Sequence, residues 1–143
     1  MKVVSLVERN GQKRSFHVAN ADTVRPILKA QIAARTHVMT DELATYKKLG
    51  KDFQKHSSVN HSAKEYARVN GNTNTVESSF AILKRGLYGT FHNVSEKHLQ
   101  RHATEFDFRW NNRIALGVDD SMRAAAALKG IGGKRLTYRR YGH

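Results

Sequence analysis

The acidic residues best placed to do chemistry in this sequence are Asp41 and Glu77. Only 12 of the 143 residues are acidic. Asp41 closely follows the short strand-like run His37–Met39, and Glu77 lies in the first turns of a helical pattern that begins at Thr73. Carboxylates from a strand end and a helix start can converge on Mg²⁺, which takes few protein oxygens and keeps its waters. Two such ions about 3.5–4 Å apart support phosphodiester chemistry. In the alternative interpretation, each acid only caps or charges a helix start.

Basic side chains follow these acids at helical spacing. Lys84 and Arg85 come about two turns after the acid of the same helical pattern, so Lys84 shares its face. Arg109 and Arg113, four residues apart in the next helical pattern, could form a second row of phosphate contacts. The alternatives are a solvated cationic face and, for Arg109, an ion pair with Glu105 at i,i+4.

The histidines indicate a metal site less clearly than the two acids do. His98 and His102 are four residues apart, which suits a shared zinc ion, but the sequence offers neither an adjacent Glu nor an evident third ligand. His61 and His92 are better interpreted as hydrogen-bonding groups near a cleft or as DNA contacts.

Short strands and longer helices must position these residues. Asn10-Gly11 predicts a hairpin, and Gly86 and Gly89 are expected to end a helix. A stripe of Leu99, Ala103, Phe106 and Trp110 is predicted to face the core. The expected strands are 2–7, 12–18, 37–39 and 56–60, and the expected helices are 23–34, 43–49, 73–87, 96–112 and 122–129. This order indicates an α/β layered fold whose sheet is thin.

Composition restricts the class of partner. The net charge is +13, with 25 Lys and Arg, which favours a polyanion such as nucleic acid. The chain has no cysteine, which excludes thiol chemistry and fits a reducing cytoplasm, where we expect it at the nucleoid. No apolar run approaches the roughly 18 residues of a membrane span, so we expect no membrane partner.

Several blocks of the sequence resemble one enzyme family. Residues 69–113 are similar to the end of the catalytic domain of bacterial insertion-sequence transposases of the DDE class. The subgroup that they resemble has the motifs HTNTIE, LKRG, GTYH and EFxFRxNxR in this region. Thr40-Asp41-Glu42 and Gly133–Tyr138 also match. The corresponding blocks here are Asn72–Glu77, Leu83–Gly86, Gly89–His92, Ser95–His102 and Glu105–Arg113.

The resemblance implies an RNase H-like mixed sheet with flanking helices. It also implies a carboxylate triad that holds two Mg²⁺ or Mn²⁺ ions and cleaves and joins DNA at element ends. Asp41 and Glu77 match the second and third acids. Double-stranded DNA, as element ends and target, is the implied partner, with a second copy or a full-length transposase as a further one. The DNA contacts that we carry over are Asn72, Asn74, Lys84, Arg85, His92, Arg109 and Arg113.

Two departures from the family pattern lead to further expectations. The first acid of the triad has no counterpart here, so we expect an N-terminally truncated catalytic domain over residues 1–120 that lacks its first central strand and is inactive alone. Residues 121–143 would be a basic tail, packed on the domain or trailing from it. The alternative is a non-enzymatic DNA-binding or inhibitory remnant. Asn72 stands where relatives have His, and Asn cannot exchange a proton near neutral pH.

Overall fold

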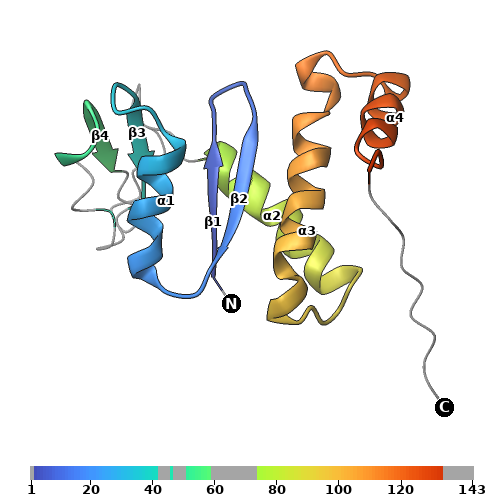
Figure 1. The fold of residues 1–143 in the computed structure, drawn as a ribbon, viewed down its shortest axis with the longest axis horizontal. Helices are drawn as coiled ribbons and strands as arrows, with labels where there is room; N and C mark the ends of the chain where they lie inside the picture. Colours follow the sequence, from blue (N-terminus) through green and yellow to red (C-terminus); the bar gives the residue numbers. More distant parts are fainter. Residues whose placement is uncertain (1, 42–45, 47–50, 59–73, 134–143) are drawn as a thin grey trace.

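The fold is a mixed α/β arrangement of two small sheets and four α-helices (Figure 1). The computed structural model describes residues 2–41, 46, 51–58 and 74–133. The α/β class expected from the sequence is confirmed. The elements in chain order are β1 (Lys2–Val7), β2 (Lys13–Val18), a 3₁₀ turn (Ala21–Thr23), α1 (Val24–Gln31), β3 (His37–Thr40), β4 (Lys55–Ser58), α2 (Asn74–Gly89), α3 (Glu96–Asn111), a 3₁₀ turn (Ile114–Leu116) and α4 (Asp120–Lys129). The predicted helix over 43–49 falls mostly outside the described residues.

The predicted hairpin is confirmed. β1 and β2 pair antiparallel from Lys2 opposite Val18 to Val7 opposite Lys13. Asn10 takes a left-handed conformation at φ 56°, which asparagine tolerates better than most residues. The Glu8 N–H donates to the Gln12 carbonyl at 2.9 Å and closes the turn.

The second sheet consists of β3 and β4, which pair parallel with His37 opposite Lys55. α1 joins β2 to β3 and, in the view of Figure 1, lies between the hairpin and the β3–β4 pair. Its buried side chains, Val24 and Leu28, pack in one apolar cluster with Val4 of β1, Val38 of β3 and neighbours from both sheets. The two sheets therefore share a single core under α1.

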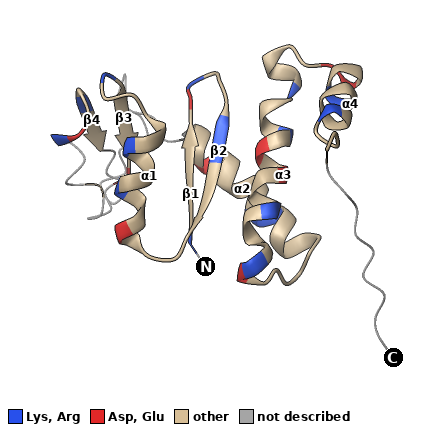
Figure 2. Cartoon of the chain, in the orientation of Figure 1, with Lys and Arg blue, Asp and Glu red and all other residues tan. Residues whose placement is uncertain are grey.

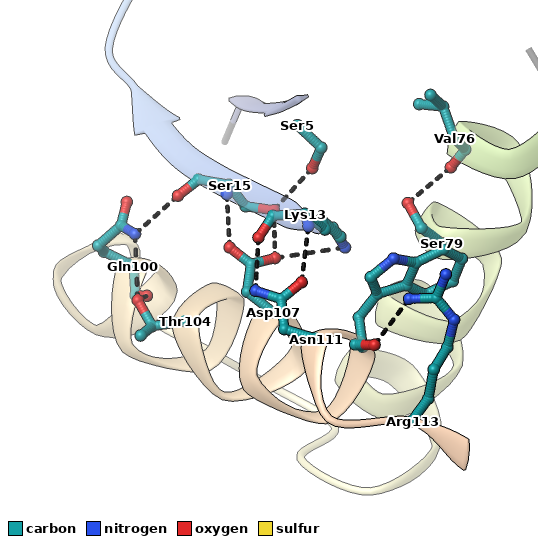
Figure 3. A network of polar contacts seen from close by, with 11 residues as sticks. Ser5, Lys13, Ser15, Val76, Ser79, Gln100, Thr104, Asp107, Asn111 and Arg113 are labelled. Carbon is teal, nitrogen blue, oxygen red and sulfur yellow. Dashed lines mark hydrogen bonds and ion pairs between the residues drawn. The ribbon is translucent and has the colours of Figure 1, made fainter. Parts of the chain in front are cut away.

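α3 closes the outer edge of the hairpin with side chains (Figure 3). Asn111 Oδ1 accepts from the Lys13 N–H at 2.6 Å, and its Nδ2 donates to the Lys13 carbonyl at 2.9 Å. Gln100, about three turns earlier in α3, accepts from the His17 N–H at 2.7 Å and donates to the Ser15 carbonyl at 3.0 Å. These amides replace the neighbouring strand that an exposed edge would otherwise recruit.

The buried carboxylate of Asp107 also bonds to this edge of β2 (Figure 3). Asp107 accepts from the Ser15 N–H and, at 2.7 Å, from the Ser15 hydroxyl. Its Oδ1 lies 3.5 Å from Lys13 Nζ, and the Lys13 side chain is 1 % exposed. Burial lowers the pKa of the Lys13 ammonium, and the Asp107 charge opposes that lowering.

α2 and α3 meet at a glycine. A Cβ at Gly86 would lie 2.1 Å from Phe106 Cζ, so the Phe106 ring occupies the space that a side chain would need. The expectation that Gly86 helps to end the helix is wrong, because α2 continues to Gly89. Gly86 is present because the two helices pack closely there.

Substituting Gly86→Ala should therefore destabilise the chain by about 1–3 kcal/mol, because the new methyl group displaces the Phe106 ring. The matched control is Gly89→Ala, since a Cβ at Gly89 meets nothing within 4 Å. That control should be neutral or stabilise by up to about 0.5 kcal/mol. Urea unfolding measures both changes, and equal effects of the two substitutions would contradict the packing role of Gly86.

Candidate functional site

Asp41 lies directly after β3 and is half-buried. The Thr40 hydroxyl donates to the Asp41 carbonyl at 2.9 Å and lies 2.9 Å from His56 Nε2 on the paired strand β4. On the same two strands, His37 Nε2 is 2.8 Å from the Ser57 hydroxyl. Hydrogen bonds between side chains thus run along the parallel pair, from His37 at the amino end of β3 to Thr40, the residue before Asp41.

The groups beside Asp41 favour their neutral forms. Burial, followed by the nearby His37, lowers the pKa of His56. Burial, followed by the charge of Asp41, raises the pKa of the Tyr46 phenol. At neutral pH His56 and Tyr46 are therefore uncharged.

Glu77 lies in the first turn of α2 and is exposed. A carboxylate there is favoured by the unpaired N–H groups and the positive end of the helix dipole. α2 packs against β1 and α3. The structure thus places both predicted acids at the element boundaries expected for them, one after a strand and one at a helix start.

The donor chemistry at these two acids fits a hard cation. Mg²⁺ is commonly held by one or two carboxylates together with waters. Within the described part of the chain, no group of three or more His, Cys, Asp or Glu residues is arranged to hold a metal. His102, a member of the zinc pair considered from sequence, packs its ring on Phe91 with the centroids 4.3 Å apart. Among the residues described, Asp41 and Glu77 are thus not members of a ready-made group of three ligands, either for zinc or for Mg²⁺.

The predicted DNA contacts of α2 and the turn after it lie at the surface. Lys84 and Arg85 are exposed. His92, in the turn between α2 and α3, is exposed and has φ 55°, a conformation uncommon outside glycine. Asn74 begins α2, and Asn72 lies outside the described residues. Figure 2 shows further Lys and Arg on β2, α1 and α3, so positive charge is spread over several elements.

The two arginines of the predicted second row have intramolecular partners. Arg109 pairs with Glu105 at 2.5 Å, the i,i+4 alternative considered from sequence. The Arg113 guanidinium stacks on the Trp110 ring at 4.3 Å and donates to the Trp110 carbonyl at 2.8 Å (Figure 3). Both arginines border an open hollow of about 170 Å³. Its other lining residues are Lys13, Ser79, Ile82, Phe106 and Trp110.

Sequence reasoning missed the polar network between α3 and β2. It placed Phe106 and Trp110 on the buried stripe, but these residues are half-buried, and the buried face continues from Leu99 and Ala103 to Asp107. The available signal was a row of Gln100, Asp107 and Asn111 at helical spacing. Such a row looks like a solvated face unless the strand edge that it covers is known.

The comparison with protein families shows to which family this chain belongs. A model of the ISXO2-like transposase domain matches residues 1–111. This chain belongs to that family. The resemblance to insertion-sequence DDE transposases is thereby confirmed. Neither the curated proteins nor the solved structures contain a significant match.

Membership in the transposase family supports a role in DNA transposition, with DNA as the partner class and a divalent metal as the cofactor generally used by DDE transposases. In the described part of this transposase domain, no helix is long and apolar enough to cross a membrane. The family match and the positions of Asp41 and Glu77 are the basis of the proposal below.

Proposed function

We propose that this transposase domain acts in DNA transposition through a divalent-cation site to which Asp41 and Glu77 contribute, beside a basic surface on α2. The observation that carries the proposal is the family match over residues 1–111, which contains both acids. Mg²⁺ or Mn²⁺, when bound, would polarise a phosphodiester and lower the pKa of an attacking water. The fold expected around this site is RNase H-like.

The chain's own residues would position the cation and the DNA. β3 fixes the backbone of Asp41, and the neutral His56 and Tyr46 nearby add no competing charge. The first turn of α2 presents Glu77. Lys84 and Arg85, two turns along α2, would contact phosphates of the strand held at the cation. The other proposed DNA contacts are Asn72, Asn74, His92, Arg109 and Arg113.

The salt dependence of DNA binding tests the basic surface. Replacing both Lys84 and Arg85 with Gln should lower the slope of log K against log salt by about 2, since each phosphate contact contributes about 0.9. Lys29→Gln is the control, because Lys29 lies on another helix, α1, and pairs with Asp52 at 3.5 Å. Fluorescence anisotropy with a duplex oligonucleotide gives both slopes. Equal slopes for the double variant and the control would exclude Lys84 and Arg85 as phosphate contacts.

We further propose that the isolated chain binds DNA without cutting it. Two carboxylates carry less charge than the triad that holds two ions in the family, so the second ion is bound weakly. The net charge of +13 favours DNA binding, which a non-enzymatic DNA-binding protein that inhibits intact transposase, the alternative, would also need.

Incubating the purified chain with a duplex that carries element ends and Mg²⁺ or Mn²⁺ tests this proposal. We expect a shifted complex and no nicked or joined product. Metal-dependent nicking or joining that is lost in Asp41→Asn would overturn the proposed inactivity. A complex that forms equally well without a divalent ion, from a chain that binds no divalent ion, would favour the non-enzymatic alternative.

A further inference from the structure

The open hollow between α2 and α3 brings aromatic rings and positive charge together. Its aromatic wall consists of Phe106 and Trp110. The Arg109 guanidinium lies 5.7 Å from the centroid of the Phe106 ring, and the Arg113 guanidinium lies 4.3 Å from that of Trp110. Trp110 is half-buried and its Nε1 atom is buried, so the exposed part of the indole is carbon. At about 170 Å³ the hollow is smaller than a pocket for a drug-sized ligand, roughly 300 Å³ or more, and suits a single flat ring.

Arg113 supplies a positive charge that the described residues do not balance. Of the other two cations in the lining, Lys13 lies 3.5 Å from Asp107, and Arg109 pairs with Glu105 at 2.5 Å. Within the described part of the chain, no acid pairs with Arg113. The hollow therefore carries about one net positive charge, which matches the single negative charge of a phosphodiester group.

The chain itself holds the Arg113 guanidinium in place. Its Nη1 donates to the Trp110 carbonyl at 2.8 Å and to the carbonyl of Gly11, in the hairpin turn, at 3.4 Å. Among the residues that the structure describes, Nε and Nη2 have no hydrogen-bond partner. These two groups form one edge of the guanidinium fork, and such an edge binds a phosphate through two parallel hydrogen bonds. Because the side chain is already ordered, it loses less entropy when a ligand binds.

The hollow lies on a different face of α2 from the proposed cation site. Ser79 and Ile82 line the hollow, and Figure 3 shows Ser79 together with Arg113 and Lys13. Ser79 and Ile82 follow Glu77 by about 200° and 140° around the helix. Lys84 returns to within about 20° of Glu77 on the same scale. The hollow is thus separate from the Glu77 and Lys84 face.

We propose that this hollow binds one unpaired base of single-stranded DNA, with the base against Phe106 and Trp110 and the adjoining phosphate at Arg113. The proposal rests on the proposed role in DNA binding but requires no divalent ion. Unstacked bases bind to aromatic rings and to the planes of arginine side chains. Every base has a flat face, so such binding tolerates different sequences. Bases inside a duplex are stacked on one another, and extracting one costs energy, so the hollow should prefer single strands.

The fluorescence of Trp110 tests the proposal, because the chain has only one tryptophan. The probes are a thymine oligonucleotide of about eight residues, within the usual site size, and an abasic oligonucleotide of the same length and charge. Each is added to the full chain without divalent ions. We expect the thymine strand to quench the Trp110 emission and to bind about tenfold more tightly than the abasic strand, since only the thymine strand can stack. A fully paired duplex should quench little.

Variants of Arg113 separate shape from charge. Arg113→Lys keeps the positive charge and loses the planar fork, so it should bind the thymine strand about tenfold more weakly than the parent chain. Arg101→Lys is the matched control, since Arg101 is an exposed arginine of α3 outside the hollow. It should bind like the parent.

A second pair of variants changes exposed residues, so the fold is not at risk. Ile82 borders the hollow and is 48 % exposed, whereas Met122 on α4 lies outside it and is 52 % exposed. Ile82→Glu places a negative charge beside the bound phosphate and should weaken binding of the thymine strand about tenfold more than Met122→Glu does.

Three results would overturn the proposal. Equal affinity for the thymine and abasic strands would reduce the site to a phosphate contact, as would unchanged binding in Arg113→Lys. Stronger quenching by the acidic peptide Glu-Glu-Phe-Glu-Glu at the same salt concentration would assign the hollow to a protein partner. Absence of quenching by the thymine strand, beside intact duplex binding through Lys84 and Arg85, would refute this site and leave the proposed function standing.

Discussion

Replacing Asp107 with alanine is expected to lower the free energy of unfolding by about 3–5 kcal/mol, a large part of the stability of a small domain. The substitution leaves the Lys13 ammonium buried without its counter-ion, which lies 3.5 Å away in the native chain. It also removes the acceptor for the Ser15 N–H and hydroxyl. A buried donor without a partner costs about 1–3 kcal/mol by itself. Chemical denaturation followed by circular dichroism measures the loss.

Two further variants separate charge from hydrogen bonding. Asp107→Asn keeps one oxygen for the Ser15 N–H and should lose about half as much stability as the alanine variant. Asp120→Ala is the surface control, since the Asp120 side chain is 90 % exposed in its pair with Arg123. That control should change stability by less than about 1 kcal/mol. A loss at Asp107→Ala no larger than that of the control would show that α3 is not held to β2 by this carboxylate.

Helices α1 to α4, the hairpin and the α/β class were predictable from sequence because their signals are local. Asn10-Gly11 specifies the turn of the hairpin directly. In α3 the periodicity correctly identified a helix but selected Phe106 and Trp110 for the core. The buried face instead runs to Asp107, since the edge of β2 needs polar partners that a hydrophobic stripe does not reveal. Gly86 was assigned to a helix end because its neighbour Phe106 lies in another helix.

The candidate site could be predicted from sequence only in part, because contacts between distant segments leave no local pattern. Asp41 and Glu77 could be proposed from sequence because each lies beside a recognisable strand or helix boundary. The hydrogen bonds of His37 and His56 at the β3–β4 pair depend on parallel pairing between segments that are distant in sequence. Local patterns carry no information on such pairing.

The second large effect is expected in metal binding. Asp41→Asn and Glu77→Gln should each weaken Mn²⁺ binding by about tenfold or more, because each removes one anionic oxygen ligand and keeps the shape of the side chain. Isothermal titration calorimetry on the folded variants measures the affinity. Asp22→Asn is the control, an exposed acid in the 3₁₀ turn before α1, and should bind Mn²⁺ like the parent chain. Unchanged affinity in either Asp41→Asn or Glu77→Gln would remove that residue from the proposed site.

The measurement closest to the central claim is paramagnetic broadening by Mn²⁺ in the NMR spectrum of the parent chain. If the carboxylates of Asp41 and Glu77 hold one ion in common, the amide signals of both residues should broaden together at substoichiometric Mn²⁺, and excess Mg²⁺ should restore both. Broadening at only one of the two positions, or at distant positions with different titration midpoints, would contradict a shared ion and with it the proposed site.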